Sequence, residues 1–216
     1  MSGGLQYYFG IDFGTTNSAT VGYIVKNQKL EYIKYGDEEG RPIPSVVAID
    51  RNTGEVYTGR RAWDKKMERS ETCEYISSVK TSLDSEKKKI IAGREWSNTD
   101  IATEVFQTLK RSVWDRTGIE MEEATVAIPI GFSSEKRIKL RQAAENAGIR
   151  IRSFVSESTA AFFANYNELK SSSLVAIFDW GGGTLDISVL RHNDGKVSEL
   201  ATVGLEIAGD YIVTGH

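Results

Sequence analysis

The chain has 216 residues, of which 26% are Asp, Glu, Lys or Arg, and its formal net charge is -3. This length can bury a substantial core in one large or two small domains, and the acidic balance argues against a nucleic-acid-binding protein, which usually carries a basic excess. The single cysteine, Cys73, excludes an internal disulfide and a multi-cysteine zinc site. The sequence shows neither a secretory signal nor an apolar run approaching the ~20 residues of a membrane helix, so we expect a soluble, cytoplasmic protein.

The first informative stretch covers residues 10–20 and reads GIDFGTTNSAT. Apolar and aromatic residues precede it at Leu5–Phe9, and β-prone residues follow it at Val21–Val25. This pattern predicts a strand, a tight turn and a second strand, with Asp12 at the end of the first strand. The simpler interpretation is a β-hairpin whose turn needs Gly and Asn only for its dihedral angles.

The turn also has the composition of an anion-binding loop. Gly14 lets the backbone bend and approach a ligand closely, and the amides of Thr15, Thr16 and Asn17 can converge on one concavity that attracts an anion. A carboxylate beside a phosphate would repel it, so Asp12 is best explained by a cation that stands between them. Mg²⁺ keeps several waters and takes few carboxylates, which suits this position.

The region between the first hairpin and residue 99 is less regular. Strands are predicted at Lys29–Lys34, which extends the hairpin, and at Val46–Asp50. From Arg60 to Ser97 the sequence is highly charged and weakly periodic, and the Lys87–Lys89 run is typical of a solvated surface. This region yields no prediction of a particular helix or strand.

A long helix is predicted over Asp100–Thr117. Asn98 or Thr99 can cap its start, and Gly118 ends it. Its apolar residues recur at helical spacing; they are Ile101, Val105, Phe106, Leu109, Val113 and Trp114.

Strands and helices then alternate as far as residue 166. A helix that begins at a Ser133 or Ser134 cap runs to Ala147, and Gly148 terminates it. The Ser171–Ser173 run indicates a boundary. The remaining predicted elements are strands at Ala124–Ile128 and Ile149–Val155, and a helix at Ser158–Tyr166.

Residues 177–187 form a second copy of the first hairpin. They read IFDWGGGTLDI and align with residues 10–20 without a gap, so that Asp179 matches Asp12 and Gly181 matches Gly14. A flexible linker is the alternative for three consecutive glycines, but strand-like residues flank them on both sides, which argues against it. Two units of one design indicate two related halves that face one ligand. His192 adjoins a predicted hairpin turn at 193–195, which argues against a serine–histidine triad or a histidine metal site.

This pair of hairpins resembles the two phosphate-binding hairpins of the actin-like ATPases, and within them most closely the ATPase domain of the seventy-kilodalton heat-shock chaperones. Three further segments match in the same order along the chain: RPIPSVV at 41–47, VAIP at 126–129 and SESTAA at 156–161. The resemblance covers nearly the whole chain, is specific in the hairpins, and is loose between residues 50 and 99.

The resemblance implies an α/β fold of the ribonuclease-H-like actin and heat-shock-chaperone ATPase type. It assigns residues 1–170 to lobe I of the ATPase domain, with a variable inserted subdomain at about 41–102. It assigns residues 171–216 to the first hairpin of lobe II. We therefore expect a complete first lobe and only the beginning of the second, and a fragment that is poorly active or inactive alone.

The resemblance also assigns roles to residues. Asp12 and Asp179 would hold hydrated Mg²⁺. Lys80, Glu157, Asp186 and Thr184 would act on the γ-phosphate and the attacking water, with Thr184 also a candidate for autophosphorylation. The phosphate-binding residues would be Gly14, Thr15, Thr16, Asn17, Gly181, Gly182, Gly183 and Thr184.

Simpler interpretations exist for three of these residues. Glu157 lies at a strand-to-helix junction, where a carboxylate stabilises the N-terminus of a helix through its dipole. Lys80 is one of 27 basic residues and nothing local distinguishes it. Asp186 lies on a predicted strand and its side chain could face solvent.

The resemblance implies binding of ATP or ADP with Mg²⁺, with K⁺ as a further candidate ion, and hydrolysis that drives opening and closing of the lobes. Its implied protein partners are unfolded client proteins and co-chaperones, through C-terminal regions that this sequence does not contain. No nucleic acid or membrane partner is implied. Ser158 departs from the family, which carries a proline there that relays the nucleotide state to the other domain, although Arg137 matches the arginine that works with it.

Two other functions fit parts of the sequence. A phosphotransferase of the sugar-kinase type would use the same hairpins with a hydroxyl acceptor. A non-catalytic scaffold would keep the fold but only sense nucleotide, and Ser158 keeps that interpretation open.

Overall fold

The computed structural model describes residues 6–26, 29–35, 41–181 and 184–206. The chain divides into two compact units, each described here by itself. Unit 1 consists of residues 1–126 and 133–153, and unit 2 consists of residues 127–132 and 154–216. Unit 2 therefore includes residues 127–132 and 154–170, which the resemblance assigns to lobe I. The predicted lobes stay a prediction, because a compact unit does not by itself define a functional lobe.

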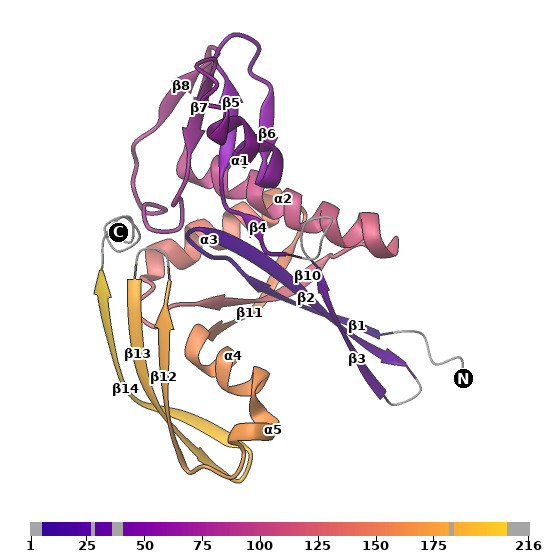
Figure 1. Cartoon of the computed structure of the whole chain (residues 1–216), viewed down its shortest axis with the longest axis vertical. Helices are drawn as coiled ribbons and strands as arrows, with labels where there is room; N and C mark the ends of the chain where they lie inside the picture. Colours follow the sequence, from indigo (N-terminus) through magenta and orange to yellow (C-terminus); the bar gives the residue numbers. More distant parts are fainter. Residues whose placement is uncertain (1–5, 27–28, 36–40, 182–183, 207–216) are drawn as a thin grey trace. The chain divides into compact units, whose positions relative to one another are not determined.

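The main sheet of unit 1 has the strand order β11-β10-β1-β2-β3, with β4 paired to β2, and the last residues of β10 and β11 belong to unit 2 (Figure 1). The antiparallel β1–β2–β3 meander confirms the predicted first hairpin and its extension. The strands are β1 (Gln6–Asp12), β2 (Asn17–Lys26), β3 (Lys29–Tyr35), β4 (Ile43–Pro44), β10 (Glu123–Ile128) and β11 (Arg150–Ser156).

Two helices of unit 1 pack side by side, α2 (Asn98–Thr117) and α3 (Ser134–Asn146). The predicted end of α2 at Gly118 is confirmed, since Gly118 caps the helix with φ 65°. The predicted cap at Asn98 or Thr99 is wrong. Ser97 caps the helix instead, because its hydroxyl accepts the Asp100 N–H while the Asp100 carboxylate accepts the Ser97 N–H at 2.8 Å, a reciprocal capping box.

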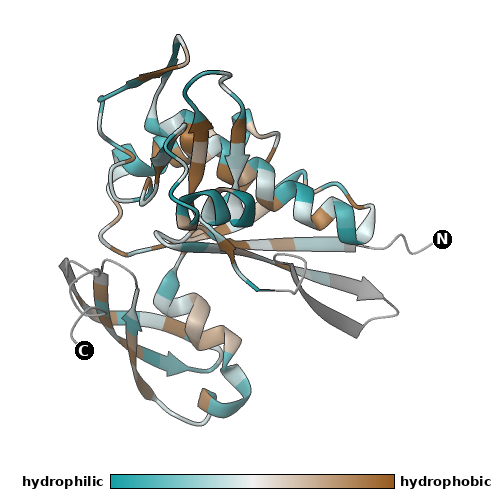
Figure 2. Ribbon diagram, turned by 45° about the horizontal axis from the view of Figure 1, so that its top comes forward, coloured by the Kyte–Doolittle hydropathy of each residue, from teal (hydrophilic) through white to brown (hydrophobic). Residues whose placement is uncertain are grey.

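The apolar face of α2 is buried as predicted, with one exception. Ile101, Val105, Phe106 and Leu109 are at most 2% exposed, whereas Trp114 is 54% exposed. Figure 2 shows that the helices carry both hydrophobic and hydrophilic residues, as expected for helices with one buried face. None of the helices in the described part of the chain is both long enough and apolar enough to cross a membrane.

The charged region from Arg60 to Ser97 contains more regular structure than its sequence predicts. Helix α1 (Gly59–Met67) packs on a three-stranded antiparallel sheet in the order β6-β5-β7, and β8 and β9 form a separate hairpin. Val46, Ala48, Ala62 and Cys73 form the buried centre of this part. The strands are β5 (Val47–Asp50), β6 (Val56–Thr58), β7 (Cys73–Ile76), β8 (Lys89–Ile91) and β9 (Arg94–Trp96).

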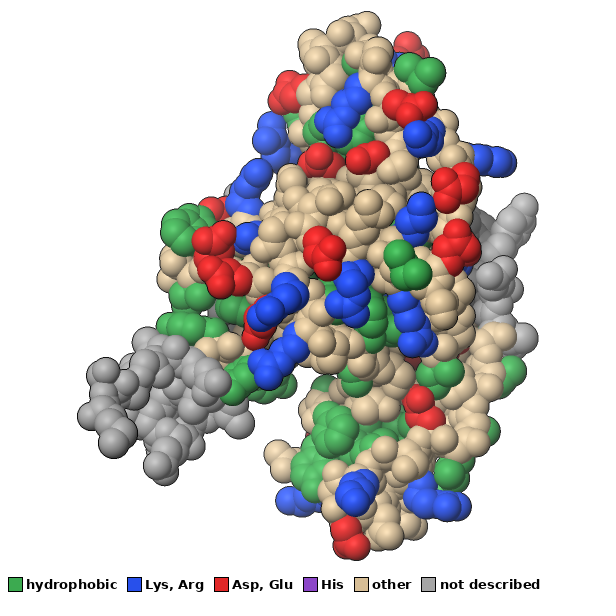
Figure 3. All heavy atoms as spheres, turned by 180° about the vertical axis from the view of Figure 1, so that it is seen from behind, with side chains coloured by type: hydrophobic (Ala, Val, Ile, Leu, Met, Phe, Trp, Pro, Cys, Tyr) green, Lys and Arg blue, Asp and Glu red, His purple; other side chains and the backbone are tan. Residues whose placement is uncertain are grey.

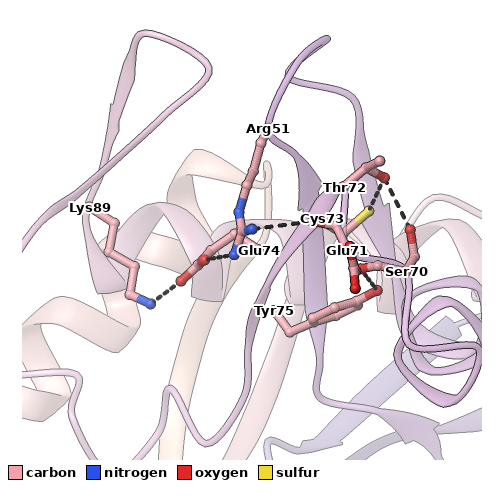
Figure 4. Close-up of polar contacts among 8 residues, drawn as sticks. All are labelled: Arg51, Ser70, Glu71, Thr72, Cys73, Glu74, Tyr75 and Lys89. Atoms are coloured by element: carbon pink, nitrogen blue, oxygen red, sulfur yellow. Dashed lines mark hydrogen bonds and ion pairs between the residues drawn. The ribbon is translucent and has the colours of Figure 1, made fainter.

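Ion pairs connect the strands of this part at the surface. Figure 4 shows the Glu74 side chain lying between Lys89 and Arg51, with Nζ–Oε1 and Nη2–Oε2 distances of 2.5 and 2.9 Å. The neighbouring cations lower the pKa of Glu74, the Lys89 hydrogen bond more than the Arg51 bond. On the face of unit 1 drawn in Figure 3, Lys and Arg side chains lie among Asp and Glu side chains.

Unit 2 contains an antiparallel sheet of β12 (Leu174–Trp180), β13 (Thr184–Asn193) and β14 (Lys196–Glu206). The helix predicted at Ser158–Tyr166 is two helices, α4 (Glu157–Ala164) and α5 (Tyr166–Leu169), separated at Asn165. Helix α4 packs against β12 (Figure 1). The predicted turn before β14 is confirmed, because Asp194 and Gly195 have φ values of 48° and 75°, which a two-residue hairpin turn requires.

Candidate functional site

The first hairpin ends as the sequence predicts, with Asp12 as the last residue of β1. Asp12 is exposed, while the next residue, Phe13, is completely buried. The Phe13 ring stacks on Phe106 of α2 with a centroid distance of 4.8 Å. This contact fixes the turn to the helix and holds the Asp12 end of the strand at the surface of unit 1.

Gly14 is required by a close approach within the turn. A Cβ atom at this position would lie 2.0 Å from the carbonyl oxygen of Asn17, which is far inside van der Waals contact. The Gly14 N–H donates to the Ser18 hydroxyl at 3.2 Å, and that hydroxyl shares a buried 2.8 Å hydrogen bond with the Ser45 hydroxyl. The Ser45 N–H donates to the Thr16 carbonyl at 2.8 Å.

Ser18 and Ser45 therefore support the turn through hydrogen bonds, a role that sequence reasoning missed. Ser45 lies in the 41–47 segment quoted for the resemblance, and its contacts explain why a small hydroxyl residue stands there. The only available signal was the pair of small polar residues beside two predicted strands. The convergence of the Thr15, Thr16 and Asn17 amides on an anion stays a prediction.

Lys80 also belongs to unit 1, in the loop that follows β7. It lies between Val79 and Leu83, which are 2% and 1% exposed and anchor the loop. Lys80 is itself only 6% exposed. This burial distinguishes Lys80 from the other lysines whose side chains the structure describes, in a way that its sequence context did not.

The second hairpin repeats the first one strand for strand. Asp12 pairs with Ala19 and Ile11 with Thr20 in the first hairpin, and Asp179 pairs with Asp186 and Phe178 with Ile187 in the second. These pairs are equivalent in the gapless alignment, so the structure confirms the internal repeat. Gly181 is exposed in the turn. Gly182, Gly183 and the Thr184 side chain lie outside the described residues, so their predicted roles stay predictions.

Unit 2 brings three of the predicted site residues together. Glu157, Asp179 and Asp186 line one small cavity with a volume of about 10 Å³, which is about the smallest space that holds one water molecule. The other lining residues are Pro129, Ile130, Ser158, Ser188 and Thr202. Asp186 therefore lines this cavity, whereas the simpler interpretation allows its side chain to face solvent.

Two local features place these carboxylates. Asp179 and Asp186 are cross-strand partners, so their side chains point to the same face of the sheet. Gly204 of β14 pairs with Asp186, and a Cβ at position 204 would lie 2.6 Å from Asp186 Oδ1. The glycine thus leaves the space that the Asp186 carboxylate occupies, a requirement that sequence reasoning missed.

Glu157 is the first residue of α4, at the strand-to-helix junction that the sequence predicts. The Ser156 hydroxyl caps the helix by accepting the Thr159 N–H at 3.1 Å. The position suits both readings of Glu157, since a carboxylate here interacts favourably with the helix dipole and also lines the cavity. The structure places Arg137 on α3 in unit 1 and Ser158 on α4 in unit 2.

The donor set of each hairpin suits a magnesium ion that keeps most of its waters. Mg²⁺ takes one or two carboxylates with several waters. Each hairpin carries one aspartate near the end of its first strand: Asp12 is the last residue of β1, and Asp179 is the second-last residue of β12. Over the described ranges, no three His, Cys, Asp or Glu side chains are grouped so as to hold a metal ion by themselves. The two aspartates fit the hydrated ion on the chemistry of their donors.

Comparison with known proteins identifies the family. The model of the Hsp70 protein family matches residues 58–211. The chaperone protein DnaK of Thermosipho africanus (strain TCF52B) is 31% identical over 200 residues, which are 92% of this chain and 33% of that protein. The DnaK of Ureaplasma urealyticum serovar 10 is also 31% identical, over 92% of this chain and 32% of its own length.

This chain spans about one third of the length of these curated relatives. The family match confirms the resemblance read from the hairpins, and with it the α/β fold of the actin-like ATPases. The chain belongs to the Hsp70 protein family.

Proposed function

We propose that this chain is part of the nucleotide-binding ATPase domain of a chaperone of the Hsp70 type. In this proposal both hairpins contribute to the binding of ATP or ADP with Mg²⁺, and hydrolysis drives opening and closing of the lobes. The observation that carries the proposal is the cavity in which Glu157, Asp179 and Asp186 meet. It lies where a repeated phosphate-binding hairpin meets the start of a helix.

Hydrolysis of ATP needs positioning and charge neutralisation more than covalent chemistry, because the γ-phosphate is transferred to water in line with its leaving group. A carboxylate in a cavity of one-water size can hold that water in one orientation and accept its proton. We assign this role to Glu157, with Asp186 as a second acceptor that orients the same water. Lys80 would neutralise charge that develops on the γ-phosphate.

The turns supply the phosphate contacts in this proposal. Residues 14–17 and 181–184 would donate backbone N–H groups to phosphate oxygens, and Gly14 keeps the first turn tight enough to do so. When bound to Asp12 and Asp179 through its waters, Mg²⁺ would neutralise phosphate charge. Binding of K⁺, and of client proteins and co-chaperones by the whole protein, belongs to the proposal on family membership alone.

The test is the substitution Glu157→Gln in the natural protein that contains this chain. The amide keeps the size of the side chain but cannot accept a proton, so we expect single-turnover ATP hydrolysis to fall about 100-fold or more, within the range typical of general-base loss. ATP affinity should change less than about threefold, because a water-orienting group acts chiefly in the transition state. The matched control is Glu168→Gln, an exposed glutamate on α5.

Three outcomes would contradict the proposal. Loss of affinity with an unchanged single-turnover rate would make Glu157 a structural residue at the helix start. Transfer of phosphate to a sugar hydroxyl instead of water would favour the kinase interpretation. Nucleotide binding without turnover in the unmodified protein would favour the non-catalytic scaffold.

A further inference from the structure

Glu199 makes a contact that the proposed site residues do not explain. Its Oε1 atom accepts a hydrogen bond from the Ser156 hydroxyl at 2.8 Å and a second, short one from the Ser158 hydroxyl. The two serines flank Glu157 at the start of α4, whereas Glu199 lies on β14. One carboxylate thus holds the residues on both sides of Glu157.

The Ser156 hydroxyl connects this contact to the helix itself. While it donates to Glu199, it accepts the Thr159 N–H at 3.1 Å as the cap of α4. Ser158 is 6% exposed, so its hydroxyl needs a partner inside the protein. Hydrogen bonds to an ionised carboxylate are stronger than those between neutral groups, so Glu199 restrains the first turn of α4 more firmly than a neutral cap would.

A β-bulge puts Glu199 in position for this contact. Val189 pairs with Ala201, but the next residue, Leu190, pairs with Glu199, so Leu200 is the extra residue. A shift of one residue exchanges the two faces of a strand, and bulges re-aim side chains in this way. Glu199 therefore pairs with the fully buried Leu190. It lies on the same face of the sheet as Thr202, which lines the cavity.

We propose that Glu199 is a positioning residue, which fixes the Glu157 carboxylate through Ser156 and Ser158. The inference rests on the proposed function, in which Glu157 orients the attacking water. With its neighbours held on both sides, the backbone of Glu157 is restrained from shifting along or rotating about the helix start. A displacement of about 1 Å in a reacting geometry costs about 100-fold in rate, so the loss of this restraint appears as loss of turnover rather than of nucleotide affinity.

The experiment compares Glu199→Ala, Glu199→Gln and Ser158→Ala with the unmodified natural protein. We expect Glu199→Ala to lower the single-turnover rate about 10- to 100-fold, within the range set by misplacement, with ATP affinity changed less than about threefold. Glu199→Gln keeps an acceptor oxygen and should restore most of the rate. Ser158→Ala added to Glu199→Ala should cause little further loss, because both act through one contact.

Hydrogen–deuterium exchange of the segment 157–161 is measured in parallel, and Glu168→Ala is the control. Faster exchange in Glu199→Ala, with slower exchange again in Glu199→Gln, is the expected result. A lowered melting temperature with an unchanged rate would show that Glu199 serves stability alone and would overturn the inference. The inference would also be overturned if Glu199→Gln hydrolyses ATP as slowly as Glu199→Ala while hydrogen–deuterium exchange at residues 157–161 is unchanged in both variants.

The two proposals fail in different ways. If the unmodified protein is active, Glu157→Gln is slow and the Glu199 variants are as fast as the unmodified protein, the positioning inference fails and the ATPase proposal stands. If the unmodified protein and Glu157→Gln share one background rate, the ATPase proposal fails. In that case, unchanged hydrogen–deuterium exchange at residues 157–161 in Glu199→Ala would show that Glu199 does not restrain the start of α4, and the inference would fail as well.

Discussion

Phe13→Ala tests whether the first hairpin turn depends on its anchor in α2. Phe13 is completely buried and stacks on Phe106 at 4.8 Å with an interplanar angle of 18°. Truncation of a buried phenylalanine to alanine costs about 3–5 kcal/mol, because transfer and cavity terms add. For a chain of this size 1 kcal/mol shifts the melting temperature by about 2–4 °C, so we expect a fall of roughly 6–20 °C.

The assay is thermal and urea unfolding of four proteins: unmodified, Phe13→Ala, Phe106→Ala and the double variant. The double variant should lose about 0.5–1.5 kcal/mol less than the sum of the single losses, since the ring pair is removed in each single variant. Trp114→Ala on the same helix is the control. Trp114 is 54% exposed, so we expect Trp114→Ala to lower the free energy of unfolding by less than about 1 kcal/mol. A loss below about 1 kcal/mol for Phe13→Ala, or strict additivity with Phe106→Ala, would refute the anchoring argument.

Three further predictions concern single sites. Gly14→Ala places a Cβ 2.0 Å from the Asn17 carbonyl oxygen. We expect amide chemical shifts to change mainly in the turn and ATP affinity to fall at least 10-fold. Unchanged amide shifts at residues 14–18 would contradict this prediction. The pKa of Glu74 is lowered by Lys89 and then Arg51, so its stabilisation is present above the unfolded pKa of about 4.3 and disappears as pH falls through the folded value. Glu74→Gln should lower the free energy of unfolding by up to about 1 kcal/mol at about pH 7, but not at about pH 2, as measured by urea unfolding at both pH values. His192→Phe removes the buried Nε2 atom, which has no hydrogen-bond partner among the described residues, and keeps a ring against Phe162. It should raise the free energy of unfolding by about 1 kcal/mol in urea, and a lowered free energy of unfolding would contradict this prediction.

Sequence patterns predicted those helices and strands whose apolar periodicity and end residues are visible within the segment itself. The α2 helix has an apolar face and a glycine stop, and both are visible in the sequence. The α1 helix is different, because Ala62 is its only buried apolar residue and much of its surface is Arg, Asp and Lys. Its stability comes from contacts with distant residues. Lys65 Nζ lies 4.1 Å from the Tyr57 ring centroid, and the Tyr75 hydroxyl donates to the Lys65 carbonyl at 2.8 Å.

The candidate site also contains residues that the sequence predicts and contacts that it does not predict. The internal repeat placed Asp12 and Asp179 at equivalent positions of their strands, because a duplicated pattern is readable from the sequence. The contacts of Ser45 and Glu199 join positions far apart in the chain, and no local pattern indicates them. The bulge that aims Glu199 is a further case, since its extra residue, Leu200, is an ordinary strand residue in the sequence.

The two hairpins share a backbone and differ in chemistry. Both pair in one register, yet Ala19 stands opposite Asp12 where Asp186 stands opposite Asp179. Like charges directly across a pair of strands destabilise a sheet, so folding alone does not favour Asp186 over alanine. Gly204 adds to this cost, because glycine weakens a strand interior and here leaves room for the Asp186 carboxylate. Two unfavourable choices at adjacent positions are expected where a site supports a reaction, so we propose that Asp186 of the second hairpin, and not its equivalent Ala19 in the first, supports the acid–base role proposed for Glu157.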